Sequence, residues 1–398
     1  MSVPELRFPE FEGEWEEKRI NELFEFLPTN SFSRAKLNNE SGNVKNIHYG
    51  DIHTKFPSNL DCDNVNIPFI NYDVDLSKVK TESYCKNGDL VIADASEDYD
   101  DIGKAIELRN VNNKRILAGL HTFLARDKSG LTAEGYRGYM LLNKSIKLDI
   151  KKIATGISVL GISKTNLGKL KIKLPSIPEQ EKIASFLSAV DEKIENLEKK
   201  QVLWEAYKKG MMQKIFSQEL RFKDENGEEY PEWIYLNFSE IFESISTSKY
   251  QIKSSEISQN GNFIVIDQGK NLIAGFSNHS SKVFIDIPVI VYGDHTTFVK
   301  YTENKFIIGA DGTKLLKSKI NSKLKYLYYS LDFFNVKPEG YKRHFSILRN
   351  LNLPIPFIQE QEKICYLLSN IDIKLEKIKK ELEISQDFKK GLLQKMFC

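Results

Sequence analysis

The sequence has 398 residues, of which 41% are hydrophobic and 28% are charged, and its formal net charge is +2. This composition excludes a mainly disordered chain, and the length is enough for two or more globular domains. The longest apolar runs, such as residues 284–292, are far shorter than the roughly 20 residues that cross a bilayer, and the acidic start does not resemble a signal peptide. We therefore expect a cytoplasmic protein without a membrane partner.

The first predicted domain covers residues 1–174. Apolar runs at 89–93 and 169–174 predict strands, and the turn residues at 87–89 precede the first of them. Residues 18–174 carry 24 Lys and Arg against 19 Asp and Glu, so this domain is cationic. Such an excess favours a polyanionic partner, although it is small enough to arise from surface composition alone.

Metal binding is not expected in this domain. The acidic run SEDYDD at 96–101 offers oxygen ligands for a divalent cation, but it lacks the spacing of a calcium loop, which favours a solvated turn. His48 and His53 are near neighbours without a third ligand. The four cysteines of the chain are scattered and form no CxxC pair, which indicates reduced, structural thiols.

A long helix is predicted at residues 175–217. Apolar residues recur there at alternating spacings of four and three, which is the heptad pattern of a helix that packs against a second helix. The motif EQEKI at 179–183 follows Pro178 and places glutamates in the first turn, where the helix dipole favours negative charge. We interpret the motif as an exposed helix start without chemistry of its own.

The second predicted domain covers residues 218–353. Strands are expected at 262–267, 288–292 and 305–309. Residues 234–353 carry 15 Lys and Arg against 10 Asp and Glu. Cationic and hydrogen-bonding side chains are interleaved in three Gly-containing segments, 293–302, 309–319 and 340–345. Arg, Thr and His can bond base edges and Lys can neutralise phosphate, so these segments are candidates for DNA contact.

The last segment, 354–398, repeats the first helix. A shift of 181 positions aligns 179–216 with 360–397 without a gap, and 17 of 38 residues are identical. ELRF also occurs twice, at 5–8 and 219–222, each time before a tryptophan, Trp15 or Trp233. The chain is therefore an internal duplication whose edges match and whose middles differ.

The two repeated helices, about 54 Å long for roughly 36 residues, are expected to pack on each other. We predict an α+β fold in which two α/β domains are joined by an antiparallel coiled coil with pseudo-twofold symmetry. The predicted packing residues are Ile183, Leu187, Ile194, Leu197, Ile364, Leu368, Leu375 and Ile378. The heptads disagree where Gln201 matches Leu382 and Trp204 matches Ser385, which leaves room for a local polar contact or a partner-docking notch.

Catalytic motifs are absent from the sequence: it contains no P-loop, no GxGxxG after a strand and no HExxH. A nuclease centre built from Asp286, Glu303 and Lys305 is conceivable, but such a pattern arises by chance in a chain rich in acids and lysines. An adaptor that binds proteins through its helices, and something other than DNA through its cationic domains, is the stronger alternative. Binding that survives high salt would indicate the adaptor, and metal-dependent cleavage by this chain alone would indicate the nuclease.

Several motifs resemble the specificity (S) subunits of type I restriction-modification systems. The most specific are LPxxxEQEKIAxFLxxxDxxI at 174–194 and LPxxxxxEQEKI at 353–364, together with the alternation of two dissimilar domains and two similar helices. Segments 88–107, 119–126 and 161–164 are similar to target-recognition segments of that family, as are 267–276, 293–301, 309–316 and 340–345. The resemblance covers nearly the whole chain.

The resemblance implies a subunit without catalytic activity or a cofactor of its own. Each domain would read one half of a bipartite target in double-stranded DNA, and the helices would hold the two readers at a fixed spacing. Two modification subunits, which bind S-adenosylmethionine and methylate adenine, would dock on this chain, and restriction subunits that use ATP and Mg would join through them. If the helices act as a ruler, adding a helical turn to both should change the gap between the half-sites and leave the half-sites alone.

Base contact is expected from a few residues of each domain. The set in the second domain is the better supported of the two, and His121 and Thr122 in the first are equally compatible with a buried strand. The expected DNA-binding residues are Lys104, His121, Lys164, Thr296, Lys314, Lys342, Arg343 and His344.

Overall fold

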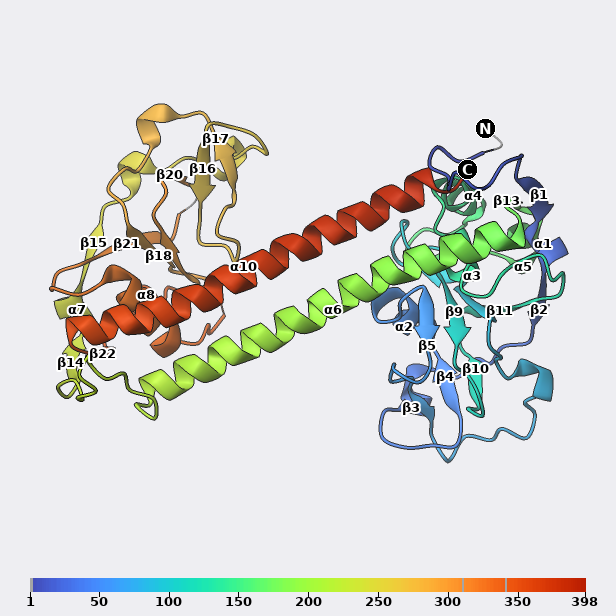
Figure 1. The fold of residues 1–398 in the computed structure, drawn as a ribbon, viewed down its shortest axis with the longest axis horizontal. Coiled ribbons are helices and arrows are strands. Elements are labelled where there is room, and N and C mark those ends of the chain that lie inside the picture. The colour runs from blue at the N-terminus through green and yellow to red at the C-terminus, as the bar shows by residue number, and fades with distance from the viewer. Residues whose placement is uncertain (1–2, 310, 341) are drawn as a thin grey trace. The chain divides into compact units, whose positions relative to one another are not determined.

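The computed structural model describes residues 3–309, 311–340 and 342–398. Residues 310 and 341 lie outside this description, although each falls in a segment predicted to contact DNA. Two compact units make up the chain: unit 1 contains Met1–Glu198 and Lys380–Cys398, and unit 2 contains Lys199–Lys379. The unit boundaries thus fall inside the two long helices, because each end of each helix joins the hydrophobic core of a unit. Figure 1 shows the elements in chain order, from blue to red.

Unit 1 contains a five-stranded sheet in the order β2-β11-β7-β9-β5 and a four-stranded sheet in the order β10-β4-β6-β3. Short pairs, β1 with β13 and β12 with β8, complete the strands in the described part of the unit. The strands are β1 (Glu16–Arg19), β2 (Phe24–Leu27), β3 (Leu37–Asn38), β4 (Lys45–Ile47), β5 (Asn59–Asp61), β6 (Phe69–Ile70), β7 (Leu90–Ala93), β8 (Ala95–Ser96), β9 (Ala105–Arg109), β10 (Ile116–Ala118), β11 (Thr122–Asp127), β12 (Leu160–Gly161) and β13 (Lys171–Leu174). The short helices are α1 (Ile20–Leu23), α2 (Tyr49–Thr54), α3 (Arg137–Met140), α4 (Lys144–Ile153) and α5 (Lys164–Lys169).

Unit 2 repeats this plan in a shorter form. Its four-stranded sheet has the order β15-β21-β18-β19, a three-stranded sheet has the order β17-β16-β20, and β14 pairs with β22. The strands are β14 (Ile234–Asn237), β15 (Phe242–Ile245), β16 (Phe263–Ile266), β17 (Gly275–Ser277), β18 (Val289–Gly293), β19 (Val299–Thr302), β20 (Phe306–Ile308), β21 (Thr313–Ser318) and β22 (Asn352–Ile355). The short helices are α7 (Phe238–Ile241), α8 (Leu324–Phe334) and α9 (Phe345–Leu348). The α+β, two-domain prediction is confirmed, and the five predicted strands correspond to β7, β13, β16, β18 and β20.

The two long helices are α6 (Ile177–Phe216) and α10 (Ile358–Lys395). Within unit 1 the end of α10 lies beside the start of α6, because the Trp15 ring contacts Phe397 and its indole N–H donates to Glu179. Further along, Glu198 of α6 accepts a hydrogen bond from Gln386 of α10, so the two segments run in opposite directions. The coiled-coil packing and the pseudo-twofold symmetry stay predictions.

The predicted packing residues are largely shielded from solvent. Of the eight, Ile194 is half-buried and the other seven are buried. Ile183 and Leu187 join the core of unit 1 together with Leu392 of α10 and Met396, the residue that follows α10. In unit 2 the equivalent Ile364 and Leu368 join a core that contains Met212 and Ile215 of α6.

The EQEKI motif lies at the start of a helix as predicted, but its first two residues are buried, so the interpretation of the motif as a solvated turn is wrong for them. The Glu179 side chain is 1% exposed. It accepts two hydrogen bonds of 2.8 Å from the Arg7 guanidinium and one of 3.3 Å from the Trp15 indole. Its counterpart Glu360 is 0% exposed and accepts from Arg221 and Trp233 in the same way. The arginine of each ELRF segment and the tryptophan that follows it therefore cover the start of each long helix.

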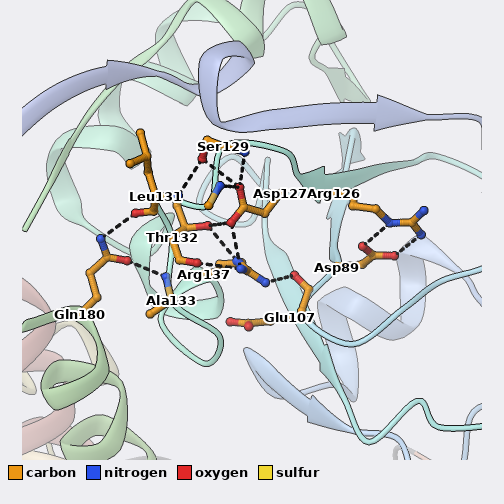
Figure 2. A network of polar contacts seen from close by, with 12 residues as sticks. Asp89, Glu107, Arg126, Asp127, Ser129, Leu131, Thr132, Ala133, Arg137 and Gln180 are labelled. Carbon is orange, nitrogen blue, oxygen red and sulfur yellow. Dashed lines mark hydrogen bonds and ion pairs between the residues drawn. The ribbon is translucent and has the colours of Figure 1, made fainter. Parts of the chain in front are cut away.

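The second residue of the motif is buried as well. The Gln180 side-chain oxygen accepts from the Ala133 amide at 2.8 Å, and its nitrogen donates to the carbonyls of Leu131 and Pro175 at 2.9 Å. Figure 2 shows this contact beside a polar network that includes Arg137 and Asp127. In unit 2 the Gln361 side-chain oxygen accepts hydrogen bonds from the Ser322 hydroxyl and the Lys323 amide, which lie just before α8. Each motif thus fixes its helix to a loop of its own domain.

A third repeated contact joins both helices to each domain. In unit 1 the Tyr139 hydroxyl donates to Asp191 at 2.7 Å, and Lys389 of α10 forms an ion pair with the same carboxylate. In unit 2 Tyr329, Asp372 and Lys208 repeat this arrangement, with 2.7 Å for both contacts. The repeated Asp and KKG residues of the sequence are therefore one duplicated network.

Candidate nucleic-acid interface

Three loops meet at one end of the sheets of unit 1. Strands β4 and β10 are parallel, so the residues that follow them, His48 and Gly119, leave at the same end. The amide of Gly119 donates to Ile47 at 2.8 Å. The loop after β7 joins them, because the Asp94 amide donates to the His121 carbonyl at 3.1 Å. We call this convergence the three-loop site of unit 1.

Aromatic and acidic side chains gather at this site. His121 has a positive φ of 54°, which is uncommon for a residue other than glycine. Its ring lies edge-on to Tyr49 with 5.3 Å between centroids, and its Nδ1 is 3.2 Å from the Asp94 carboxylate. Burial raises the pKa of Asp94, although His121 and Lys164 act in the opposite direction. The His121 side chain remains 51% exposed, so it can reach a ligand.

The structure brings the other two predicted residues of this domain to the same place. The Lys104 ammonium donates to the His53 carbonyl at 2.7 Å, and His53 also lies 6.0 Å from the Tyr49 ring. The Lys164 ammonium lies 5.6 Å from the Phe123 ring, in the strand that follows His121. All three therefore lie around one site, and their contact with DNA stays a prediction.

Unit 2 has the same convergence. The Gly309 amide donates to Ile266 at 3.0 Å, as Gly119 does to Ile47, and the Asp294 amide donates to the Gly312 carbonyl at 2.7 Å. Thr296 lies in the loop after β18 and its hydroxyl donates to the Gln268 carbonyl. Lys314 is the second residue of the neighbouring strand β21, and its ammonium lies 5.8 Å from the Phe345 ring. We call this convergence the three-loop site of unit 2.

The segment with Lys342, Arg343 and His344 folds onto this site. Lys342 and Arg343 are exposed, and the His295 Nδ1 lies 3.2 Å from the Lys342 carbonyl. His344 is fully buried: one ring nitrogen accepts from the Glu339 amide at 3.0 Å and the other lies 3.1 Å from the Asp294 carbonyl. The expectation that His344 contacts bases is therefore wrong, because both of its nitrogens hold the segment in place.

Sequence reasoning did not single out four residues of these sites, although segments 88–107, 267–276 and 309–316 contain three of them. In unit 1 the parallel pair β4 with β10 brings Tyr49 to the turn that contains His121, and Asp94 arrives from the end of β7. In unit 2 the parallel pair β16 with β20 brings Gln268 to Asp311. The Gln268 amide donates to the Asp311 carbonyl at 3.0 Å and its oxygen accepts from the His295 amide at 3.2 Å. A further hint in the sequence is the strand-then-Asp pattern at 90–94 and 289–294.

The acids considered for a nuclease centre have other partners. Asp286 forms an ion pair with Lys317 at 2.7 Å, and Glu303 accepts from the Tyr301 hydroxyl at 2.9 Å. Among residues 3–309, 311–340 and 342–398, no group of three His, Cys, Asp or Glu is placed to hold a metal ion. Over the same residues, no helix is long and apolar enough to cross a membrane.

The fold defines a class of proteins in which one chain contains two related units in tandem, each with one three-loop site. The family described as type I restriction modification DNA specificity domain matches residues 12–204 and again residues 230–386. The chain therefore belongs to this family, as a DNA specificity subunit of the type I restriction-modification class, which confirms the resemblance seen in the sequence.

Known proteins give the same result. The chain is 28% identical over 307 residues, 70% of each chain, to a protein named as the MjaX specificity subunit of a type I restriction enzyme in Methanocaldococcus jannaschii. The MjaVIII specificity subunit of the same organism is 25% identical over 301 residues, which are 64% of this chain and 68% of the relative. A crystal structure of the type I restriction-modification S subunit from M. genitalium covers 100% of this chain and 99% of its own, with a TM-score of 0.65 and 18% identity. That structure supports the fold alone.

Proposed function

We propose that each unit reads one half of a bipartite target in double-stranded DNA and that this chain performs no catalysis. The observation that carries the proposal is the repeated three-loop site, which has one backbone plan in both units and different side chains in each. One frame with two different surfaces fits a reader of two different half-sites. The lysines around both sites supply the positive charge that phosphates require.

The long helices are the second part of the proposal. With 40 and 38 residues, α6 and α10 are about 60 and 57 Å long. Half-sites one turn of B-DNA apart are separated by about 34–36 Å, so helices of this length suffice to space two readers on successive major grooves. Two modification subunits dock on this frame and bring S-adenosylmethionine, and restriction subunits bring ATP and Mg.

Methylation mapping tests the proposal. The chain is expressed with its modification subunit, and methylated adenines are mapped over a plasmid library that contains random sequence. We expect one two-part motif, with two defined half-sites separated by a fixed number of unspecified base pairs. Methylation without a motif, or with one continuous motif, would exclude the proposed function. Binding of the complex to DNA should weaken steeply with salt, whereas an adaptor with another ligand would keep its binding.

A further inference from the structure

The two domains share more than a general plan, because their sheets match residue by residue. In unit 1 Thr122 of β11 lies opposite Ala93 of β7, and in unit 2 Thr313 of β21 lies opposite Gly293 of β18. The residue after each β7 or β18 is an aspartate, Asp94 or Asp294, as the strand-then-Asp pattern of the sequence suggests. Structurally equivalent positions can therefore be compared although the sequences of the two domains differ.

The parallel strand pairs extend the match to the other two loops. Ile47 and Ile266 end β4 and β16, so Tyr49 corresponds to Gln268. His121 and Gly312 both have a positive φ, 54° and 79°, and both accept from the amide of the matched aspartate. The chain keeps the backbone of this turn in both units and changes the side chain on it.

His121 adopts a backbone conformation that is strained for a residue with a β-carbon. Glycine would adopt the same turn without this strain, so a purely structural role does not explain the imidazole. A residue with a positive φ is normally glycine, as in unit 2, because a β-carbon is strained there. In unit 1 that position carries His121, half-exposed and oriented by Asp94 and Tyr49. An oriented, exposed imidazole is suited to bonding a base edge.

Unit 2 has no imidazole on the corresponding turn, where Gly312 stands, but its three-loop site borders a hollow. An open hollow of about 760 Å³ borders its three-loop site and is lined by Gln251, Gln268, Asp311 and the cations Lys253 and Lys282, among others. The Gln251 amide donates to the Asp311 carboxylate at 2.8 Å. Carboxylate and amide groups match the donors and acceptors of base edges, and lysines match phosphates. The hollow thus combines the two kinds of contact that a half-site needs.

We propose that the three-loop site of each unit is the surface that touches base edges, and that the solvent-accessible side chains around it set which half-site the unit reads. In unit 1 these are Tyr49 and His121. In unit 2 they are Asp311 and Gln251 in the hollow. The proposal rests on the proposed function and adds to it the location and the residues of the two reading surfaces.

The test maps methylation by the full chain with its modification subunit on a library in which both half-sites are randomised. His121→Asn in unit 1 removes the imidazole and keeps a residue that tolerates a positive φ. Asp311→Ala alters an exposed side chain of unit 2. Each should lower the preference at one or two base pairs of one half-site by roughly 10- to 100-fold and leave the other half-site unchanged.

Matched controls lie at the opposite ends of the same sheets. Tyr72 is 70% exposed and follows β6, which runs antiparallel to β4 and therefore ends away from the site. Glu303 is exposed and follows β19, whose last residue pairs with the first residue of β18. Tyr72→Ala and Glu303→Ala should leave both half-sites as they are. Tm values within about 2 °C of the parent would show that all four variants fold.

The outcomes separate the inference from the function on which it rests. A parent complex without a two-part motif would contradict the proposed function itself. A two-part motif that His121→Asn and Asp311→Ala both leave unchanged would overturn the inference alone. Equal weakening on all sequences would also overturn it, because it would mean that these side chains contact phosphates and not bases.

Discussion

Two glutamates, Glu179 and Glu360, show how much a single residue of the repeat contributes. Each lies in the first turn of a long helix, buried, and bonded to an arginine and a tryptophan that arrive from a distant segment. These bonds raise the pKa of Arg7, so the guanidinium stays charged. The favourable dipole of the helix start adds to the stability of the buried carboxylate.

Replacing Glu179 with Ala should destabilise unit 1 by about 2–4 kcal/mol. Removing one partner of a buried ion pair commonly costs about 3–5 kcal/mol. The cost is expected to be lower here because the Arg7 guanidinium, left without its partner, keeps some contact with water. Thermal unfolding of the parent and the variant measures the effect. Glu181→Ala, at an exposed position two residues later, is the control and should have little effect. An equal Tm for both variants would contradict the assigned role of Glu179.

Glu107 gives unit 1 a dependence on pH. Its carboxylate is fully buried and accepts from the amides of Gly135 and Gly138 at 2.6 and 2.8 Å. Burial raises the pKa of Glu107 to about 7, from 4.5 for the free side chain. The folded state therefore holds a proton that the unfolded state releases, and this contribution to stability is complete below pH 4.5 and lost as the pH rises through 7.

The pH dependence can be isolated with a neutral variant. Between pH 5 and 8 the parent should lose up to about 3 kcal/mol of unfolding free energy relative to Glu107→Gln, which has no proton to release. Denaturant unfolding at both pH values measures the difference. Glu25→Gln, at an exposed position, should follow the parent at each pH. A constant difference between parent and Glu107→Gln would show that Glu107 is ionised throughout.

At the scale of elements, the duplicated network explains why both helices repeat the same few polar residues. An aspartate of one helix receives a hydroxyl from the domain and an ammonium from the other helix, once in each unit. One contact thus fixes a domain, the start of one helix and the end of the other. This is a reason for the repeat that heptad spacing alone does not provide.

Removing the hydroxyl of Tyr139 should cost about 1–2 kcal/mol, since hydrogen bonds to charged groups contribute about 1.5–3 kcal/mol and this one is only partly buried. Tyr329→Phe should cost the same in unit 2, and the double variant should show the sum, because the two networks share no residue. Calorimetry of the three variants gives these values, with Tyr366→Phe, at a 75% exposed position, as the control. Strongly unequal costs would mean that the two networks are not equivalent.

The elements were largely predictable from the sequence, whereas the contacts between them were not. Heptads and apolar runs located both long helices and five strands, because periodic burial leaves a local pattern. Glu179 was misjudged because a glutamate in the first turn of a helix gives the same sequence pattern whether it is buried or solvated. His344 was misjudged because a cationic, Gly-containing segment resembles a surface loop, while its partner Asp294 lies 50 residues away. The three-loop sites depend on parallel strand pairs, which sequence spacing does not reveal.

At the scale of the whole molecule, the chain contains one structural framework twice, and the two copies differ in their exposed loop side chains. The anchors at Glu179 and Glu360, the networks at Asp191 and Asp372 and two backbone hydrogen bonds of the loops recur in both units, and the exposed side chains of the loops differ. A duplicated frame of this kind lets one reading surface change without disturbing the other. Its two helices pass from unit 1 to unit 2 near residues 198 and 380, where neither network is touched.

That boundary is where the spacer role of the helices can be tested without loss of either unit. One added turn, four residues inserted after Glu198 in α6 and before Lys380 in α10, lengthens each helix by about 6 Å, the length of one to two base pairs. Methylation mapping should show a gap longer by that amount between unchanged half-sites. An insertion in α6 alone is the control: it cannot satisfy Asp191–Lys389 and Lys208–Asp372 together, so the Tm should fall. Altered half-sites, or an unchanged gap in a folded double insertion, would refute the idea that helix length sets the spacing.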